Sequence, residues 1–207
     1  MMKAAPIVHV VDDDRSFRES IGELLNACGY QTLLYDNARQ LLAGPISSEA
    51  GCILLDVKMD GLSGPQVQND LVDRGCMLPV VFVSGYKDVP VAVQTIKAGA
   101  EDFLTKPVEK DRLLEAIERA VARYEARRAQ KDEISLLRSR IGELTRRERE
   151  VFDHLVRGLP HKQIAYAMSI SERTVKLHRH QIVHKLQVRS LADLAVIAER
   201  LGLLPNG

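Results

Sequence analysis

The sequence lacks the features that mark membrane and secreted proteins. No apolar run approaches the roughly 20 residues of a membrane-spanning helix. The N-terminus has one lysine and then a strand-like segment ending in acids, unlike a signal peptide. The three cysteines, Cys28, Cys52 and Cys76, form no Cys-x-x-Cys pair, so neither a disulfide nor a zinc site is implied. We therefore expect a cytoplasmic protein that binds no membrane.

A large net charge is also absent, because the 207 residues carry 29 Lys and Arg against 28 Asp and Glu. The balance is nevertheless uneven along the chain. From Glu143 onward 11 basic residues face 7 acidic ones, while the preceding part has 18 against 21. The length allows two small domains. The sequence thus predicts an acidic first domain and a basic second domain whose charge suits nucleic acid.

Short apolar segments alternate with segments of helical periodicity through the first part of the chain. Such alternation implies a parallel sheet with helices on both faces. For five units we expect the flavodoxin-like strand order 2-1-3-4-5, with a crevice between strands 1 and 3. The expected strands are 7–11, 31–35, 52–56, 80–84 and 102–105, and the expected helices between them are 15–28, 38–42, 65–74 and 89–98.

Polar side chains end four of these strands: Asp12 and Asp13, Asp56, Ser84, and Lys106. Taken alone, Asp56 leaves three interpretations open: a metal ligand, a nucleophile, or only the polar end of a strand. All of these residues are expected at the ligand-binding edge of the sheet, where three carboxylates would repel one another without a cation. Oxygen ligands suit Mg²⁺. One carboxylate can attack phosphorus, while lysine and serine contact the phosphoryl group.

Residues 7–121 resemble the receiver domain of two-component response regulators. The resemblance rests on four motifs: Val-Asp-Asp-Asp (11–14), Leu-Asp-Val-Lys-Met-Asp-Gly-Leu-Ser-Gly (55–64), Val-Ser-Gly-Tyr (83–86) and Lys-Ala-Gly-Ala-Glu-Asp-Phe-Leu-Thr-Lys-Pro-Val (97–108). It implies that a histidine kinase phosphorylates Asp56. It also implies a cis Lys106-Pro107 bond. The further implied roles are Mg²⁺ binding, with Mn²⁺ as a substitute, by Asp12, Asp13, Asp56 and the Lys58 carbonyl, phosphoryl binding by Ser84 and Lys106, and an aromatic switch at Phe103.

One position departs from the family pattern. Proline usually follows the residue equivalent to Met59, and this sequence has Asp60 there. The loop loses a fixed φ and gains an N–H and a negative charge. This change either loosens the loop or adds a local pair with Lys58. It leaves Asp56 as the expected phosphoacceptor.

The connector from Asp111 to Ile141 contains neither glycine nor proline, so we expect one long helix. Its later part carries apolar residues at spacings of three and four, namely Ile134, Leu137, Ile141 and Leu144. This short seam either packs on the chain's own domains, which we favour, or pairs with another chain.

The second domain begins with a capping box, Thr145 with Glu148, at the start of a helix that runs to Gly158. A short helix over 162–168 and a third helix, capped by Ser171 and ending near Leu186, follow. Two helices joined by a short turn in a basic segment predict a helix-turn-helix.

The third helix has two faces. Val175, His178, Ile182 and Leu186 share the apolar stripe, whereas Arg173, Lys176, Leu177, His180 and His184 lie on the other side. A leucine out of phase with the core is either a single exposed leucine of no consequence or a groove-reading residue beside Lys176. We favour the interpretation that Leu177 contacts bases in the major groove.

Residues 144–198 resemble LuxR/FixJ/NarL-type DNA-binding domains, within the FixJ/StyR/TodT-like group. The motifs are Leu-Thr-Arg-Arg-Glu-Arg-Glu-Val (144–151), Lys-Gln-Ile-Ala (162–165), Ile-Ser-Glu-Arg-Thr-Val-Lys-Leu-His-Arg (170–179) and Lys-Leu-Gln-Val-Arg-Ser (185–190). The resemblance implies that the helix from Ser190 to Leu201 is a dimer element. Pro160-His161 departs from the usual capping pair. The expected DNA contacts are Arg173, Thr174, Lys176, Leu177, Arg179, His180 and Lys185.

Together these features predict a receiver domain (1–122), a helical linker (123–142) and a helix-turn-helix domain (143–207). We expect a transcription regulator, an activator, that dimerises on phosphorylation and works with RNA polymerase on double-stranded DNA. Its own catalysis would be limited to Mg²⁺-dependent self-phosphorylation and slow self-dephosphorylation. The alternatives are a Mg²⁺-dependent phosphohydrolase that uses the same aspartates, and a constitutive DNA-binding protein with a vestigial receiver.

Overall fold

The structure, a computed structural model, describes residues 5–44, 49–85 and 89–204. Tyr86, the last residue of one receiver motif, lies outside these ranges. The chain divides into two compact units, Met1–Arg128 and Ala129–Gly207. The border falls within one helix, α5 (Lys110–Gly142), so the linker expected over 123–142 is helical throughout. The three domain limits given above stay a prediction.

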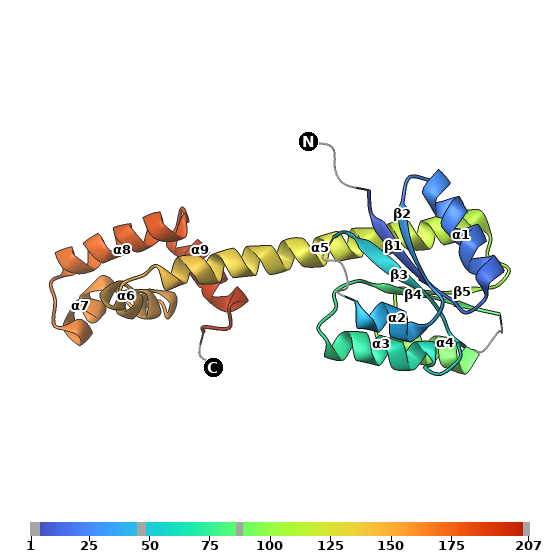
Figure 1. Cartoon of the computed structure of the whole chain (residues 1–207). Helices are drawn as coiled ribbons and strands as arrows, with labels where there is room; N and C mark the ends of the chain where they lie inside the picture. The colour runs from blue at the N-terminus through green and yellow to red at the C-terminus, as the bar shows by residue number, and fades with distance from the viewer. Residues whose placement is uncertain (1–4, 45–48, 86–88, 205–207) are drawn as a thin grey trace. The chain divides into compact units, whose positions relative to one another are not determined.

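The first unit is built on a five-stranded parallel sheet (Figure 1). Its order, β2-β1-β3-β4-β5, confirms the flavodoxin-like order expected for five such units. Strands β1 and β3, which pair inside the sheet, are buried almost throughout, and this burial explains their continuous apolar runs. The strands are β1 (Ile7–Val11), β2 (Gln31–Tyr35), β3 (Gly51–Asp56), β4 (Val80–Ser84) and β5 (Asp102–Thr105).

Helices cover both faces of the sheet (Figure 1). Helix α1 (Arg15–Ala27) and the first part of α5 share one core with Val8, Val10 and Leu54. Helices α2 (Ala38–Ala43), α3 (Gly64–Asp73) and α4 (Val89–Lys97) lie against the opposite face. The Asp14 carboxylate caps α1 by accepting hydrogen bonds from the backbone N–H groups of Ser16 and Phe17.

The pairing of β1 with β3 places two acidic residues side by side. Val11 is the register partner of Leu55, so Asp12 and Asp56 leave the sheet at adjacent positions. Strand order reverses between these two strands, since β2 lies beyond β1 and β4 lies beyond β3. The acidic residues therefore occupy the topological switch point, where ligands bind in open α/β sheets.

The second unit is helical. It contains the last turns of α5, then α6 (Arg146–Val156), α7 (His161–Met168), α8 (Glu172–Leu186) and α9 (Leu191–Arg200). Three residues of the predicted seam, Leu137, Ile141 and Leu144, are buried in its core. The seam thus packs within the chain, the reading that we favoured. Within the described residues, no helix is long and apolar enough to cross a membrane.

The predicted helix starts are present in the second unit. Thr145 and Glu148 form the capping box of α6, and the Ser171 hydroxyl accepts a hydrogen bond from the Thr174 N–H at the start of α8. Pro160 occupies the N-cap position of α7 and offers no side-chain hydrogen bond. The departure at Pro160 thus leaves α7 without a side-chain cap.

Gly64 is where the fold leaves no room beside the acidic edge. A Cβ at this position would lie 2.5 Å from the Asp56 carbonyl oxygen and 2.8 Å from a ring atom of Phe82. We expect Gly64→Ala to lower the free energy of unfolding by about 1–3 kcal/mol, because the backbone of β3 must shift. Urea denaturation followed by circular dichroism measures this change. Gly44→Ala is the matched control, since no atom lies within 4 Å of its added Cβ; equal losses in both variants would contradict the packing argument.

Candidate functional site

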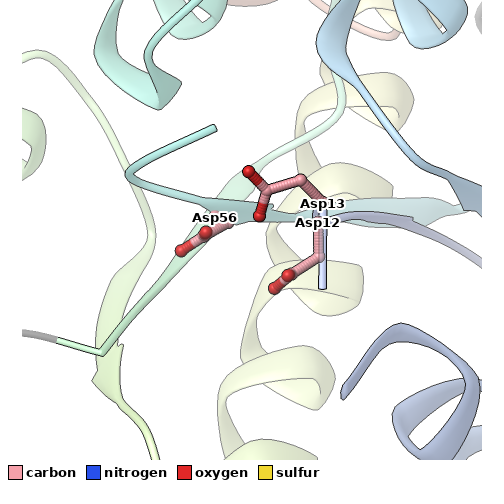
Figure 2. Close-up of side chains that lie close together, drawn as sticks. All are labelled: Asp12, Asp13 and Asp56. Atoms are coloured by element: carbon pink, nitrogen blue, oxygen red, sulfur yellow. The ribbon is translucent and has the colours of Figure 1, made fainter. Parts of the chain in front are cut away.

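Three carboxylates gather at the carboxyl edge of the sheet (Figure 2). Asp12 and Asp13 follow β1, and Asp56 ends β3. One ligand oxygen from each lies within 4.8 Å of the other two. Asp12 and Asp56 are buried, while Asp13 is exposed. The cluster therefore has a closed inner side and an open outer side from which a small ion or a phosphoryl group can approach.

Lys106 supplies positive charge to this cluster from the end of β5. Its Nζ donates a hydrogen bond to Asp12 Oδ2 at 2.6 Å and lies 3.8 Å from Asp56 Oδ1. The ammonium also lies over the ring of Phe17, 4.1 Å from the ring centroid. The Lys106 backbone N–H donates to the Ser84 carbonyl oxygen, and the Lys106-Pro107 bond is cis, as the family resemblance implied.

The Asp56 carboxylate has an altered acidity. Burial raises its pKa to about 6, and the neighbouring Asp12 charge acts in the same direction. Lys106 and the Val57 N–H, which donates to Asp56 Oδ1 at 2.9 Å, oppose that rise. At neutral pH the group is mainly ionised and more basic than an ordinary carboxylate. A more basic carboxylate is a better nucleophile.

The donor set suits a hard divalent cation. Three carboxylates that approach one another this closely carry an excess of negative charge that one lysine does not cancel, and Mg²⁺ binds a few carboxylates together with water. The Lys58 residue is exposed on the loop that follows β3. A carbonyl ligand from that loop would complete the set that the family resemblance implies.

The two predicted phosphoryl-binding and switch residues on β4 and β5 lie beside this edge. Ser84 is buried at the end of β4. Phe103 on β5 is half-buried, with its ring centroid 6.4 Å from that of Phe82. Phe103 is therefore neither fully buried in the core nor fully exposed to solvent.

Two residues of α1 at this edge were missed in the sequence. Arg18 donates from Nη1 to the Asp12 carbonyl oxygen at 2.5 Å, and Phe17 lies beneath the Lys106 ammonium. Both were assigned to the helix alone, Phe17 through its apolar spacing. Their only sequence signal is their closeness to the acidic run, because contact with Lys106 depends on folding across the sheet.

Asp60, the departure from the family pattern, also contacts this cluster. Its backbone N–H donates to Asp13 Oδ2 at 3.3 Å. Of the two expectations for this position, a looser loop or a pair with Lys58, neither includes this contact between the loops after β3 and β1.

A candidate nucleic-acid interface lies on α8. Val175, Ile182 and Leu186 are buried, whereas Leu177 remains 56% exposed. The exposed side also carries cations, which confirms the predicted division of the helix into two faces. The exposed polar residues on it are Arg173, Lys176, His180 and His184. Thr174 and Arg179 are half-buried at its margins.

Lys185, one of the expected DNA contacts, pairs with an acidic residue of the second unit. Its Nζ donates to the buried Glu148 carboxylate at 2.7 Å and to the Glu143 carbonyl oxygen at 3.2 Å. Burial alone would raise the pKa of Glu148, but the hydrogen bonds from Lys185 and Thr145 outweigh it and hold the pKa below its ordinary value. Lys185 thus neutralises a buried acid, and its expected contact with DNA stays a prediction.

Known proteins resemble both parts of the chain. Residues 8–118 match the response regulator receiver domain family, and residues 142–198 match the luxR family of bacterial regulatory proteins. The chain is 38% identical over 201 residues to response regulator protein TodT of Pseudomonas putida, covering 97% of this chain and 88% of TodT. It is 37% identical over 199 residues to transcriptional regulatory protein FixJ of Rhizobium meliloti, covering 96% and 98%. The structure of response regulator StyR superposes with a TM-score of 0.84 and 41% identity, covering 95% of this chain and all of that one.

The raised pKa of Asp56 predicts a pH-dependent stability. Because the folded-state pKa is about 6 and the ordinary value is 3.8, ionisation of Asp56 costs stability above pH 6. Asp56→Asn should therefore raise the free energy of unfolding by about 2 kcal/mol at pH 8, and the gain should shrink between pH 6 and pH 4. Urea denaturation in a chelating buffer measures it. Glu23→Gln, at an exposed carboxylate of α1, is the control; a gain for Asp56→Asn that is equal at pH 8 and pH 4 would contradict the prediction.

Proposed function

This chain belongs to the response regulators that join a receiver domain to a luxR-type DNA-binding domain, and from that premise we propose that phosphorylation of Asp56 controls its binding to DNA. The observation that carries the proposal is the convergence of Asp12, Asp13 and Asp56 with Lys106 at one sheet edge. The same chain presents an exposed basic helix face. The first unit thus offers a phosphoacceptor, and the second offers a surface that can bind DNA.

In the proposed reaction a carboxylate oxygen of Asp56 attacks the phosphorus of a phosphohistidine on a partner histidine kinase. A P–O bond forms, the P–N bond breaks, and the kinase histidine leaves. Since Asp56 Oδ1 is held by the Val57 N–H, we assign the attack to Oδ2. A divalent cation, held by the three carboxylates and the Lys58 carbonyl, would neutralise charge on the phosphoryl group.

Lys106 and Ser84 then stabilise the product. The Lys106 ammonium is already 3.8 Å from Asp56, so a small movement brings it to a phosphoryl oxygen. The Ser84 hydroxyl donates a second hydrogen bond to that group. Movement of Ser84 toward the phosphoryl group leaves space into which the half-buried Phe103 turns.

We place the dimer contact on α4. Val89, Val93 and Ile96 follow one another at helical spacing and are 67%, 48% and 45% exposed. An apolar stripe of this kind on a surface helix suits a second copy of the chain. Rotation of Phe103 on the neighbouring strand would reshape this face, so that phosphorylation favours the dimer.

In the dimer, two copies of α8 would read a two-fold DNA site in the major groove. We assign base contacts to Lys176, Leu177 and His180, with the leucine near thymine methyl groups. Arg173, Thr174 and Arg179 are placed beside phosphates. The protein would act in the cytoplasm as an activator that works with RNA polymerase.

No observation favours the two alternative functions. A phosphohydrolase gives no role to the exposed Leu177, and the relative FixJ is a transcriptional regulatory protein. A vestigial receiver rested on Asp60 alone, and the Asp60 N–H donates to the acidic cluster.

The first test is phosphate labelling coupled to DNA binding. A small phosphodonor with Mg²⁺ should label the full chain, and Asp56→Asn should abolish the label because it lacks a nucleophilic carboxylate. Phosphodonor should also tighten binding of the wild type to its DNA site at fixed salt, without effect on the variant. Full labelling of Asp56→Asn would refute the site, turnover of an external phosphate ester would favour the phosphohydrolase, and equal DNA affinity with and without donor would favour the vestigial receiver.

The second test examines the DNA-reading face. Because Lys176 is assigned to a base contact, Lys176→Met should weaken binding by about 1–3 kcal/mol and relax specificity at one position of the site. A uniform loss across DNA sequences, with the slope of log affinity against log salt lowered by about 1, would instead place Lys176 at a phosphate. Leu177→Ala should weaken specific binding without changing the salt slope. Arg15→Met, on α1 of the first unit, removes the same charge away from α8 and is the control. Binding as tight as wild type in both α8 variants would exclude this face.

A further inference from the structure

The hydrogen bond from Asp60 to Asp13 joins two loops that are 47 residues apart in sequence. The donor is a backbone N–H, and proline, the residue usual at this position in the family, has none. The contact is therefore one that the common sequence cannot make. Asp60 is exposed, so its side chain is not required for packing.

The hydrogen bond from Asp60 is one of three similar bonds to the acidic cluster. Each of the three carboxylates accepts a hydrogen bond from a backbone N–H in one of the two loops that follow β1 and β3. Asp12 accepts from Asp14 at 3.0 Å, Asp56 accepts from Val57 at 2.9 Å, and Asp13 accepts from Asp60 at 3.3 Å. The first two donors lie one or two residues after their acceptors in sequence. The third comes from the other loop and depends on residue 60 having an N–H.

We propose that the Asp60 backbone N–H is a positioning group for the divalent-cation site, holding Asp13 in place before the cation arrives. This inference rests on the proposed function of the cluster. Asp13 is the exposed member, and repulsion from Asp12 and Asp56 would otherwise turn it toward solvent. With one oxygen held by Asp60, the other is free to face the cation, as ligating carboxylates commonly are held by second groups.

The same bond also fixes the loop that carries Lys58. Asp60 lies two residues after Lys58, whose carbonyl is the proposed fourth protein ligand. Tying Asp60 to Asp13 therefore sets the distance between two ligands from different loops. A proline in place of Asp60 would have to set the loop by its ring alone, without a bond to Asp13.

The Asp60 side chain makes a second, separable contribution. Its negative charge is exposed near the site and attracts a cation over a distance, an effect that salt screens. The N–H contribution depends on a short contact and is screened much less. Two substitutions separate them: Asp60→Asn removes the charge and keeps the N–H, while Asp60→Pro removes both.

The test is a titration of the full chain and of each variant with Mg²⁺, in which amide NMR shifts report binding. Each titration is run at about 0.05 M and at about 0.5 M salt, because the screening lengths at these two concentrations differ severalfold. Asp60→Asn should weaken binding at low salt only. Asp60→Pro should weaken binding relative to Asp60→Asn by roughly tenfold at both salts, because a group that orients a metal ligand is lost. Unfolding curves confirm that both variants remain folded.

Equal Mg²⁺ affinity of Asp60→Pro and Asp60→Asn at high salt, or tighter binding by Asp60→Pro, would overturn the inference. Phosphodonor labelling of Asp56 in the same samples separates this result from failure of the proposed function. If the wild type is labelled and the two variants bind Mg²⁺ alike, only the positioning role is wrong. If the wild type neither binds Mg²⁺ nor accepts phosphate, the proposed function is wrong and the inference is lost with it.

Discussion

Repulsion among three carboxylates is the constraint on which the first unit depends. Asp12, Asp13 and Asp56 lie within 4.8 Å of one another, two of them buried, and burial makes each charge more costly. Lys106 offsets part of that cost through its hydrogen bond to Asp12. The fold thus holds an edge that gains stability from added positive charge.

Backbone groups share the task of holding this edge. Gly64 brings the first turn of α3 so close to the Asp56 carbonyl that no Cβ fits between them. The N–H groups of Asp14, Val57 and Asp60 each orient one carboxylate. Local geometry therefore fixes the directions of charges that would otherwise move apart.

The second unit handles charge in a different way. Its buried acid, Glu148, is both a helix cap and the partner of Lys185, so an interior charge is neutralised by a lysine that the sequence pattern alone assigned to the surface. The cations on the exposed side of α8 remain available for a polyanion. Lys185 is thus paired with a buried acid, while Arg173 and Lys176 stay exposed on α8.

The sequence by itself determined the helices and strands and the polar residues at the strand ends, because short apolar runs, 3.6-residue periodicity and cap residues are local signals. The division of α8 into two faces followed from phase in the same way. The strand order was an expectation taken from the usual arrangement of five such units, and the structure confirmed it. Only the tertiary structure decided the contacts between distant segments: Lys106 with Phe17, Lys185 with Glu148, and Asp60 with Asp13. Each joins residues far apart along the chain, and the distance between them is set by how the strands and helices pack, for which no local pattern exists.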